Sequence, residues 1–437
     1  MENKEKTIEK RNRIERNRGN IGINIAIVIT VAIIIFAIVV LIMAIGERVK
    51  NKEEITQSAK TEQSKEEKTE EKKEEGKKAE EKIINLEDNE YMHVEIDRSG
   101  DKVPVPNGYV GSSVSGEKEE NEIDTGYVIY EGEEEVTEAN VEEARKTRNQ
   151  YVWVPVPDAS KIYGTDAKGK KWGKLYSFST TSGDEITGTS AYGWSESNGE
   201  MRITSSYREP DVLRDYDKDS RLKTLGLGVK TMNEFNMEIN REFARAIKSI
   251  EKYGGYYIGR YETGGLNGTA KIVKGETNIA RQTWYTMYKK CKELAGENRN
   301  VETGMIWGCE QDRVLMWLIE SGNKTKEQVC KDSVEWGNYR NNAIEYVTSS
   351  GSVSMTTEGS SRVIPAGASE QTKANNIYDL AGNVWDWGME AYSTYGRRCR
   401  GGYCDVTSTN YPACYRGYGF PASHGDYLGC RATLYIR

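Results

Sequence analysis

The sequence predicts an α+β, loop-rich domain over residues 88–437, preceded by one transmembrane helix and a charged stalk. Three observations lead to this prediction. An uncharged apolar segment near the N-terminus is long enough to cross a bilayer. A run rich in glutamate and lysine follows that segment. The remainder contains most of the 43 glycines and 27 tyrosines, and its apolar residues recur at helical spacing in some segments and at strand spacing in others.

Composition limits the function classes. With a net charge of −7 and a pI of about 5.4, the chain has no general basic surface for nucleic acid. The two histidines are His93 and His424, so a metal site with two imidazoles would need both of them. A Cys–His or Ser–His–Asp centre would have to use one of the two. Because the seven cysteines are an odd number, at least one is a free thiol or pairs with another chain.

The N-terminal region predicts a membrane anchor, with the lipid bilayer as its partner. Residues 19–46 carry no charge, and Ile25–Ile45 would form a helix about 31 Å long, which matches a hydrocarbon core of about 30 Å. A cleaved signal peptide has a shorter apolar region of about 7–15 residues, which favours a retained anchor. Basic residues are in excess before the segment. This predicts a cytoplasmic arm over 1–20, a membrane helix over 21–46 and an outward-facing C-terminal part at the cell membrane.

Residues 47–87 predict a stalk between the membrane and the C-terminal domain. They consist almost entirely of Glu, Lys, Gln, Ser and Thr, so they cannot bury a core. Forty residues would span about 60 Å as a helix or roughly 35 Å as a flexible coil. A coiled coil is disfavoured because the segment has no apolar heptad pattern.

Short strands are expected at the start of the outer domain. Val103–Pro106 and Tyr127–Tyr130 are typical strand sequences. Tyr151–Pro157 also alternates, and its prolines predict an edge strand because proline cannot donate to a ladder of hydrogen bonds. Residues 158–229 are rich in Ser, Gly and Thr and predict long loops.

Three apolar stripes at helical spacing predict helices over residues 235–250, 284–294 and 314–318. Glycines follow each stripe and predict the helix ends. The strand Tyr256–Glu262 is expected between the first two helices. After residue 340 the chain is rich in Gly, Ser and Tyr, which predicts short strands and loops.

Three C-terminal motifs carry a resemblance to a known family. Asn376–Trp387 contains Gly-Asn-Val-Trp-Asp-Trp, followed by Arg-Gly-Gly-Tyr at 400–403 and Gly-Cys-Arg at 429–431. In this order they resemble the formylglycine-generating enzyme (sulfatase-modifying factor) family over roughly residues 90–437. The resemblance implies a variant of the C-type lectin fold. Trp385 and Trp387 are expected in its core.

In that family, oxidase members bind copper(I) through two cysteines, and soft thiolates suit this ion. The resemblance places Cys404 and Cys414 at these positions, but nine residues separate them, which departs from the family spacing. The alternative for this pair is a disulfide that braces a loop outside the cell. By the same resemblance, Cys399 and Cys430 lie on strands that would be neighbours, so they are a second candidate disulfide.

The resemblance also implies a calcium site. Its ligands would be the Asp379 and Asp386 side chains and the carbonyls of Gly382 and Val384. Calcium takes six to eight oxygen ligands, which such a set would begin to supply. Asp386 replaces the more common glutamate of the family. The alternative is that Asp379 caps a turn and Asp386 makes an ordinary hydrogen bond.

The C-terminal loops predict a ligand-binding surface because Tyr, Ser, Asn and Gly dominate recognition loops of this composition. Its candidate residues are Tyr411, Tyr415, Tyr418, His424, Asp426 and Tyr427. The first hypothesis is an outward-facing display module that binds an extracellular protein or glycan without chemistry. The alternative is a formylglycine-generating-type oxidase that uses Cys404, Cys414 and copper. A third hypothesis is a structural protein that spaces envelope layers through its stalk.

Overall fold

The computed structural model describes residues 84–437, apart from 115–117, 167–168, 266–267, 394–395 and most of 176–230. These residues belong to one unit, Lys82–Arg437. Within them, no helix is long and apolar enough to cross a membrane. The predicted basic arm, membrane helix and nearly all of the stalk lie outside the described residues.

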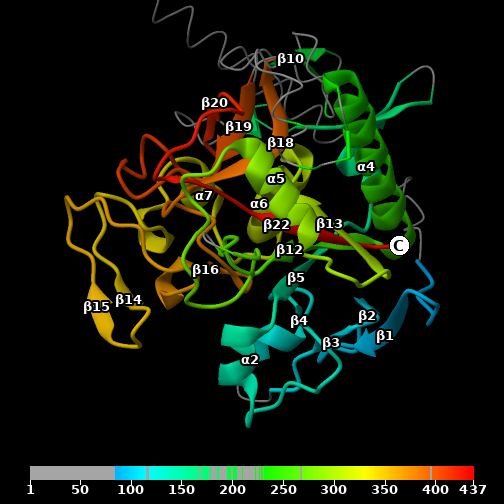
Figure 1. The fold of residues 1–437 in the computed structure, drawn as a ribbon, viewed down its shortest axis with the longest axis horizontal. Helices are drawn as coiled ribbons and strands as arrows, with labels where there is room; N and C mark the ends of the chain where they lie inside the picture. The colour runs from blue at the N-terminus through cyan, green and yellow to red at the C-terminus, as the bar shows by residue number, and fades with distance from the viewer. Residues whose placement is uncertain are drawn as a thin grey trace, which may run out of the picture. The chain divides into compact units, whose positions relative to one another are not determined.

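Two sheets form the centre of the described structure (Figure 1). The larger sheet has the order β13-β22-β12-β5-β4-β3 and is antiparallel throughout. Its strands are β3 (Tyr109–Gly111), β4 (Val128–Glu131), β5 (Gln150–Pro155), β12 (Gly255–Gly259), β13 (Val301–Met305) and β22 (Ala432–Ile436). The smaller sheet has the order β20-β19-β18-β21, with a parallel pair at β18 and β21. Its strands are β18 (Trp385–Ser393), β19 (Gly396–Arg400), β20 (Arg416–Gly419) and β21 (Leu428–Cys430).

The remaining described strands form two-stranded hairpins around these sheets. They are β1 (Met92–Ile96) with β2 (Lys102–Pro106), β6 (Tyr163–Thr165) with β7 (Lys171–Gly173), β8 (Ser177–Phe178) with β9 (Glu185–Ile186), β10 (Trp194–Ser197) with β11 (Glu200–Ile203), β14 (Glu345–Val347) with β15 (Val353–Met355), and β16 (Lys373–Ala374) with β17 (Ile377–Tyr378). The described part therefore mixes helices and antiparallel strands, which confirms the predicted α+β class at this level.

The predicted edge position of the strand around Tyr151 is wrong. β5 lies inside the larger sheet and pairs with β4 on one side and β12 on the other. Pro155 ends the strand opposite Gly255, and Pro157 lies beyond it. Because the prolines fall at the end of the strand, they leave its internal ladder of hydrogen bonds intact.

The three predicted helices are confirmed. They are α4 (Met232–Tyr253), α5 (Trp284–Glu293) and α6 (Gly308–Glu320), with shorter helices α2 (Val141–Thr147) and α7 (Lys326–Cys330). In α4, the Thr231 hydroxyl accepts a hydrogen bond from the Glu234 N–H at the start, and Gly254 ends the helix with φ +82°. The short helices α2 and α7 were not expected, since α2 is mostly charged and α7 has only five residues.

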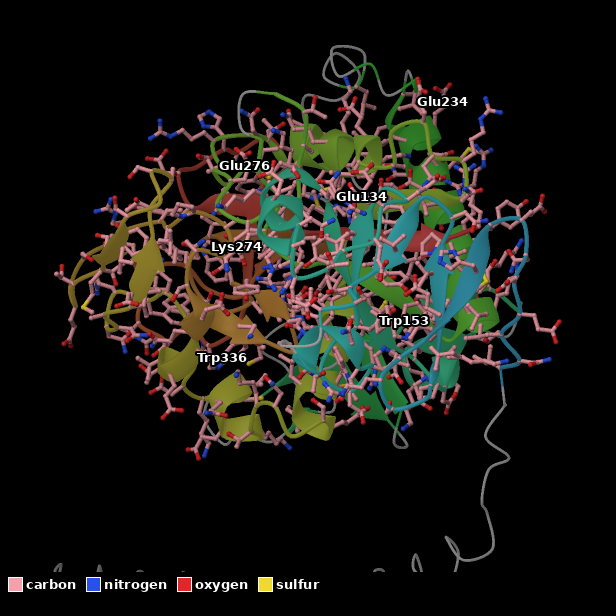
Figure 2. All side chains as sticks on the ribbon, turned by 90° about the horizontal axis from the view of Figure 1, so that it is seen from below. Glu134, Trp153, Glu234, Lys274, Glu276 and Trp336 are labelled. Atoms are coloured by element: carbon pink, nitrogen blue, oxygen red, sulfur yellow. The ribbon has the colours of Figure 1, made fainter. Side chains whose placement is uncertain are left out.

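Aromatic side chains fill the interface between the larger sheet and its helices. Trp153 of β5, labelled in Figure 2, packs against Tyr257 of β12 with ring centroids 4.9 Å apart. Phe235 of α4 lies edge-to-face on Trp284 and Tyr288 of α5, at 6.1 and 5.3 Å. Such contacts stabilise the core beyond the burial of apolar area alone.

A buried ion network joins α6 to the smaller sheet. Asp312 of α6 accepts hydrogen bonds from Arg400 at 2.7 Å and from Arg416. Glu390 of β18 accepts from Arg416 at 3.0 Å and from Arg400 at 3.2 Å, and Arg398 lies 3.8 Å away. All five side chains are at most 3% exposed. The network holds β18, β19 and β20 in place beneath the loops that carry the predicted site.

Candidate functional site: an aromatic platform

Five aromatic side chains meet on the loops at the end of the smaller sheet. Trp385 lies 5.6 Å from Tyr403, 6.0 Å from Tyr411 and 5.9 Å from Tyr415 between ring centroids. Tyr411 and Tyr415 are 4.7 Å apart, and Tyr427 lies 5.1 Å from Tyr403. Trp385 is 9% exposed and the four tyrosines are half-buried. We refer to these five residues as the aromatic platform.

Adjacent strands bring the distant parts of the platform together. Trp385 begins β18, whose neighbour β21 starts at Leu428, directly after Tyr427. The Trp385 N–H donates to the Tyr427 carbonyl at 2.8 Å, so the two segments are fixed by backbone contacts. The position of both rings is therefore set by the sheet rather than by a free loop.

Two glycines shape the loop that carries the remaining tyrosines. Gly401 and Gly402 have φ values of +90° and +76°, a region that favours glycine. A Cβ atom at Gly402 would lie 2.5 Å from the Tyr411 carbonyl oxygen. The Gly401 carbonyl accepts hydrogen bonds from the Gly382 N–H at 2.8 Å and from the Tyr339 hydroxyl at 2.9 Å. The loop is thus tightly anchored where it leaves β19.

Cys404 lies beside the platform and is fully buried. Burial, together with the nearby Asp405 and Glu262 carboxyls, raises the pKa of its thiol to about 12. In turn, the sulfur adds to the effect of burial in raising the pKa of Tyr403 and Tyr427. Since the thiolate is the nucleophile and the metal ligand, this environment opposes both roles at neutral pH.

Alkylation tests this environment. In the native full-length chain at pH 8, roughly one Cys404 in ten thousand would be thiolate, so we expect very slow labelling by iodoacetamide. Labelling should become rapid in denaturant, and peptide mapping by mass spectrometry measures both rates. Native labelling of Cys404 at the rate of a free small-molecule thiol would contradict this description.

Cys414 lies against the end of α7. Its sulfur lies 3.8 Å from the Cys330 carbonyl at the end of α7, and its N–H donates to the Val329 carbonyl at 3.1 Å. Among the described residues, which include all seven cysteines, no disulfide joins Cys404 to Cys414. The structure therefore does not form the predicted brace between them, and the copper(I) assignment stays a prediction.

The predicted pairing of Cys399 with Cys430 is also wrong. The two residues lie on β19 and β21, on opposite sides of β18, and both are paired with Trp387. Two strand spacings place their Cα atoms roughly 9–10 Å apart. A disulfide needs Cα atoms within about 7 Å.

The four predicted calcium ligands lie close together but are already engaged. Asp379 accepts hydrogen bonds from the Gly367 N–H and the Thr372 hydroxyl, each at 2.7 Å. Asp386 accepts from the Arg431 guanidinium at 3.0 Å, which leaves only its Oδ1 atom without a partner. Across the described part of the chain, no group of three or more His, Cys, Asp or Glu is placed to hold a metal ion. Asp379 and Asp386 are thus engaged by protein donors in this arrangement, and the calcium assignment to Asp379, Gly382, Val384 and Asp386 stays a prediction.

A third carboxylate, Glu262, completes this buried acidic cluster. It accepts hydrogen bonds from the Asn278 and Asn383 amides at 2.6 Å and from the Val384 N–H at 3.3 Å. Burial, reinforced by the charges of Asp379 and Asp386, raises the pKa of Glu262 well above its usual range. Glu262, Asp379 and Asp386 together carry more negative charge than the one neighbouring arginine, Arg431, can neutralise. Protonation and hydrogen bonds offset the excess negative charge. The sequence predicted Glu262 only as the last residue of a strand and did not indicate that it joins this cluster.

The structure divides the predicted ligand-binding surface. Tyr411, Tyr415 and Tyr427 belong to the platform, whereas Tyr418 is 58% exposed and stacks on Tyr392 with centroids 4.0 Å apart. Asp426 forms an exposed ion pair with Arg281 at 2.6 Å, and His424 is exposed. No ring contact links these three residues to the platform among the described side chains. The site residues that the sequence analysis missed are Trp385, which it expected in the core, and Tyr403.

The two described surface cavities are lined by residues outside the aromatic platform. Two surface cavities of about 450 and 720 Å³ share Arg245, Glu302 and Arg437 in their linings. Arg245 is already bound to Glu302 at 2.7 Å. Neither of these two cavities is lined by a platform residue.

Comparisons with known proteins add the following. No family model matches the chain, and no curated protein matches it. Three solved structures are similar to part of it. PvdO from Pseudomonas aeruginosa is 12% identical with a TM-score of 0.29, over 42% of this chain and 82% of that one. Treponema denticola variable protein 1 is 16% identical with a TM-score of 0.26, over 42% and 85%. CarF is 10% identical with a TM-score of 0.26, over 42% and 87%. Similarity at this level carries no statement about activity.

Proposed function

We propose that this protein is a membrane-anchored, outward-facing binding module that holds a protein or glycan ligand on the aromatic platform. The domain has, in this proposal, a formylglycine-generating-enzyme-like variant of the C-type lectin fold without thiol oxidase chemistry. The observation that carries it is the convergence of Trp385 with four half-buried tyrosines on anchored loops. The uncharged segment 21–46 and the stalk 47–87 support display away from a bilayer.

The platform suits recognition for a physical reason. Tyrosine and tryptophan present a large apolar face together with a polar edge, and they lose little side-chain entropy when a ligand orders them. Trp385 packs against Tyr403 and Tyr411, which supports a largely preformed surface. Preformed surfaces bind more tightly because less freedom is lost on association.

A thiol-based oxidase reaction has less support than ligand binding. An oxidase of the copper(I) type needs two thiolates that converge on one ion. Here the Cys404 thiol has a pKa of about 12 and the Cys414 sulfur faces the Cys330 carbonyl. The two residues are therefore assigned to packing around the platform rather than to catalysis.

Binding measurements on the full-length chain in detergent micelles test this proposal. The chain is screened against a glycan array and a library of extended peptides, and the affinity of the tightest ligand is measured by calorimetry. Tyr411→Ala should weaken binding by roughly tenfold or more, because a central aromatic contact is typically worth more than 1 kcal/mol. Adding EGTA tests the predicted calcium site separately, because removal of a required calcium ion would lower the affinity.

Tyr392→Ala is the matched control, because Tyr392 is also a partly exposed, stacked tyrosine but lies outside the platform. It should retain the affinity of the original chain. Equal losses in both variants would contradict the assignment of the site. Oxygen- and copper-dependent conversion of a cysteine-containing peptide to its aldehyde, abolished by Cys414→Ser, would replace the proposal with the oxidase.

A further inference from the structure

Two cysteines outside the platform lie in direct contact. The sulfurs of Cys291 and Cys430 are 3.6 Å apart, and both side chains are fully buried. Cys291 lies on α5 and Cys430 ends β21, so the two residues are 139 positions apart in the chain. The packing of the fold, and not local sequence, brings them together.

Separate contacts fix the positions of Cys291 and Cys430. Cys430 is fixed by the pairing of β21 with β18 and by the hydrogen bond from the Thr263 N–H to its carbonyl at 3.0 Å. Cys291 is carried by α5, whose Trp284 indole donates to the Gly388 carbonyl of β18 at 3.0 Å. A disulfide has an S–S bond of about 2.05 Å, so closure from this contact requires an approach of about 1.5 Å, which side-chain rotation and small shifts of α5 can supply.

We propose that Cys291 and Cys430 form a structural disulfide when the protein folds in an oxidising compartment. Of the sulfur pairs among the described cysteines, this is the one whose contact distance is established. The remaining five stay as thiols. This cross-link requires no ligand and is independent of the proposed binding function.

The oxidation proceeds by thiol–disulfide exchange with a low-molecular-weight disulfide such as oxidised glutathione. One protein thiolate attacks the reagent disulfide, forms a mixed disulfide and releases one reagent thiol. The second protein thiolate then attacks the protein sulfur of the mixed disulfide and releases the other reagent thiol. The two protein thiols lose two protons and two electrons in total, and the reagent gains them as two thiols.

Burial of the two thiols determines the stage of folding at which this exchange occurs. Burial, reinforced by the neighbouring Cys291, raises the pKa of the Cys430 thiol well above its usual range, so little thiolate exists in the folded domain. The bond therefore forms while α5 docks on the sheet. Once formed, it is shielded from reductants until the domain opens.

Peptide mapping of the full-length chain tests the proposal. The chain is refolded with oxidised glutathione, unfolded in guanidinium chloride at about pH 6.5 with excess N-ethylmaleimide to alkylate the free thiols, and digested without reduction. We expect one disulfide-linked peptide pair that contains Cys291 and Cys430, with the other five cysteines alkylated. Alkylation of both residues, or linkage of Cys430 to a different cysteine, would overturn the proposal.

A stability comparison provides the second readout. Oxidation should raise the thermal midpoint of the original chain, and treatment with dithiothreitol in denaturant before refolding should remove this increase. In Cys291→Ala and Cys430→Ala the oxidised and reduced forms should melt together, whatever each substitution does to folding itself. Cys399→Ala, also a buried cysteine in the sheet, should keep the difference. An increase that persists in Cys291→Ala would refute the assignment.

Discussion

Replacing Asp312 with alanine is expected to destabilise the folded protein by about 3–5 kcal/mol. Asp312 is fully buried and binds both Arg400 and Arg416, which are themselves at most 3% exposed. Removal of its carboxylate leaves two buried guanidinium groups with Glu390 as the anion that still binds both. Urea unfolding, followed by circular dichroism, measures the change in the free energy of unfolding.

Asp426→Ala is the matched control for this prediction. Asp426 also pairs with an arginine, Arg281, at 2.6 Å, but both side chains are more than half exposed. Exposed pairs contribute roughly 0–1 kcal/mol, so this variant should unfold close to the original chain. A loss at Asp312→Ala no larger than that at Asp426→Ala would show that the buried ion network does not hold the smaller sheet to α6.

Glu310→Gln is expected to remove a large pH-dependent loss of stability. Glu310 is fully buried on α6, where its carboxyl accepts hydrogen bonds from the Tyr435 hydroxyl at 2.7 and 2.8 Å. Burial raises its pKa from 4.5 to about 8. The folded state therefore keeps a proton that the unfolded state releases, so this contribution is fully present below pH 4.5 and is lost as the pH rises through 8.

Between pH 6 and pH 9 the original chain should lose roughly 3 kcal/mol relative to Glu310→Gln, because each pH unit below the folded pKa contributes about 1.4 kcal/mol. Urea unfolding at a series of pH values measures this difference. Tyr435→Phe keeps the carboxyl and should retain the pH dependence. Parallel stability curves for the original chain and Glu310→Gln would contradict the prediction.

Local patterns explain which parts of the fold were predictable. The stripe from Phe235 to Ile250 and the terminating Gly254 are properties of α4 itself, so sequence spacing is sufficient to locate the helix. The strands expected at Val103–Pro106 and Tyr127–Tyr130 are likewise confirmed as β2 and β4, and both are almost continuously buried. The family resemblance predicted functional residues at Cys404 and Cys414. The aromatic platform lies in the same segment of the chain.

Long-range partners explain what was missed. The central position of β5 depends on strands that lie before and after it in the chain, and its prolines suggested an edge. Arg416 and Asp312 are 104 positions apart, and isolated charged residues look like surface residues in a sequence. Trp385 is mostly buried, as expected for a core residue. Its remaining exposed surface and the four tyrosines of the platform form the candidate site.

Hydrogen exchange of the full-length chain, with and without the tightest ligand from the glycan and peptide screens, locates the binding surface directly. If the aromatic platform binds the ligand, amide exchange should slow in residues 401–415 and around Tyr427, with little change along α4 or the β14–β15 hairpin. Protection confined to the cavities around Arg245, with none in residues 401–415, would contradict the account.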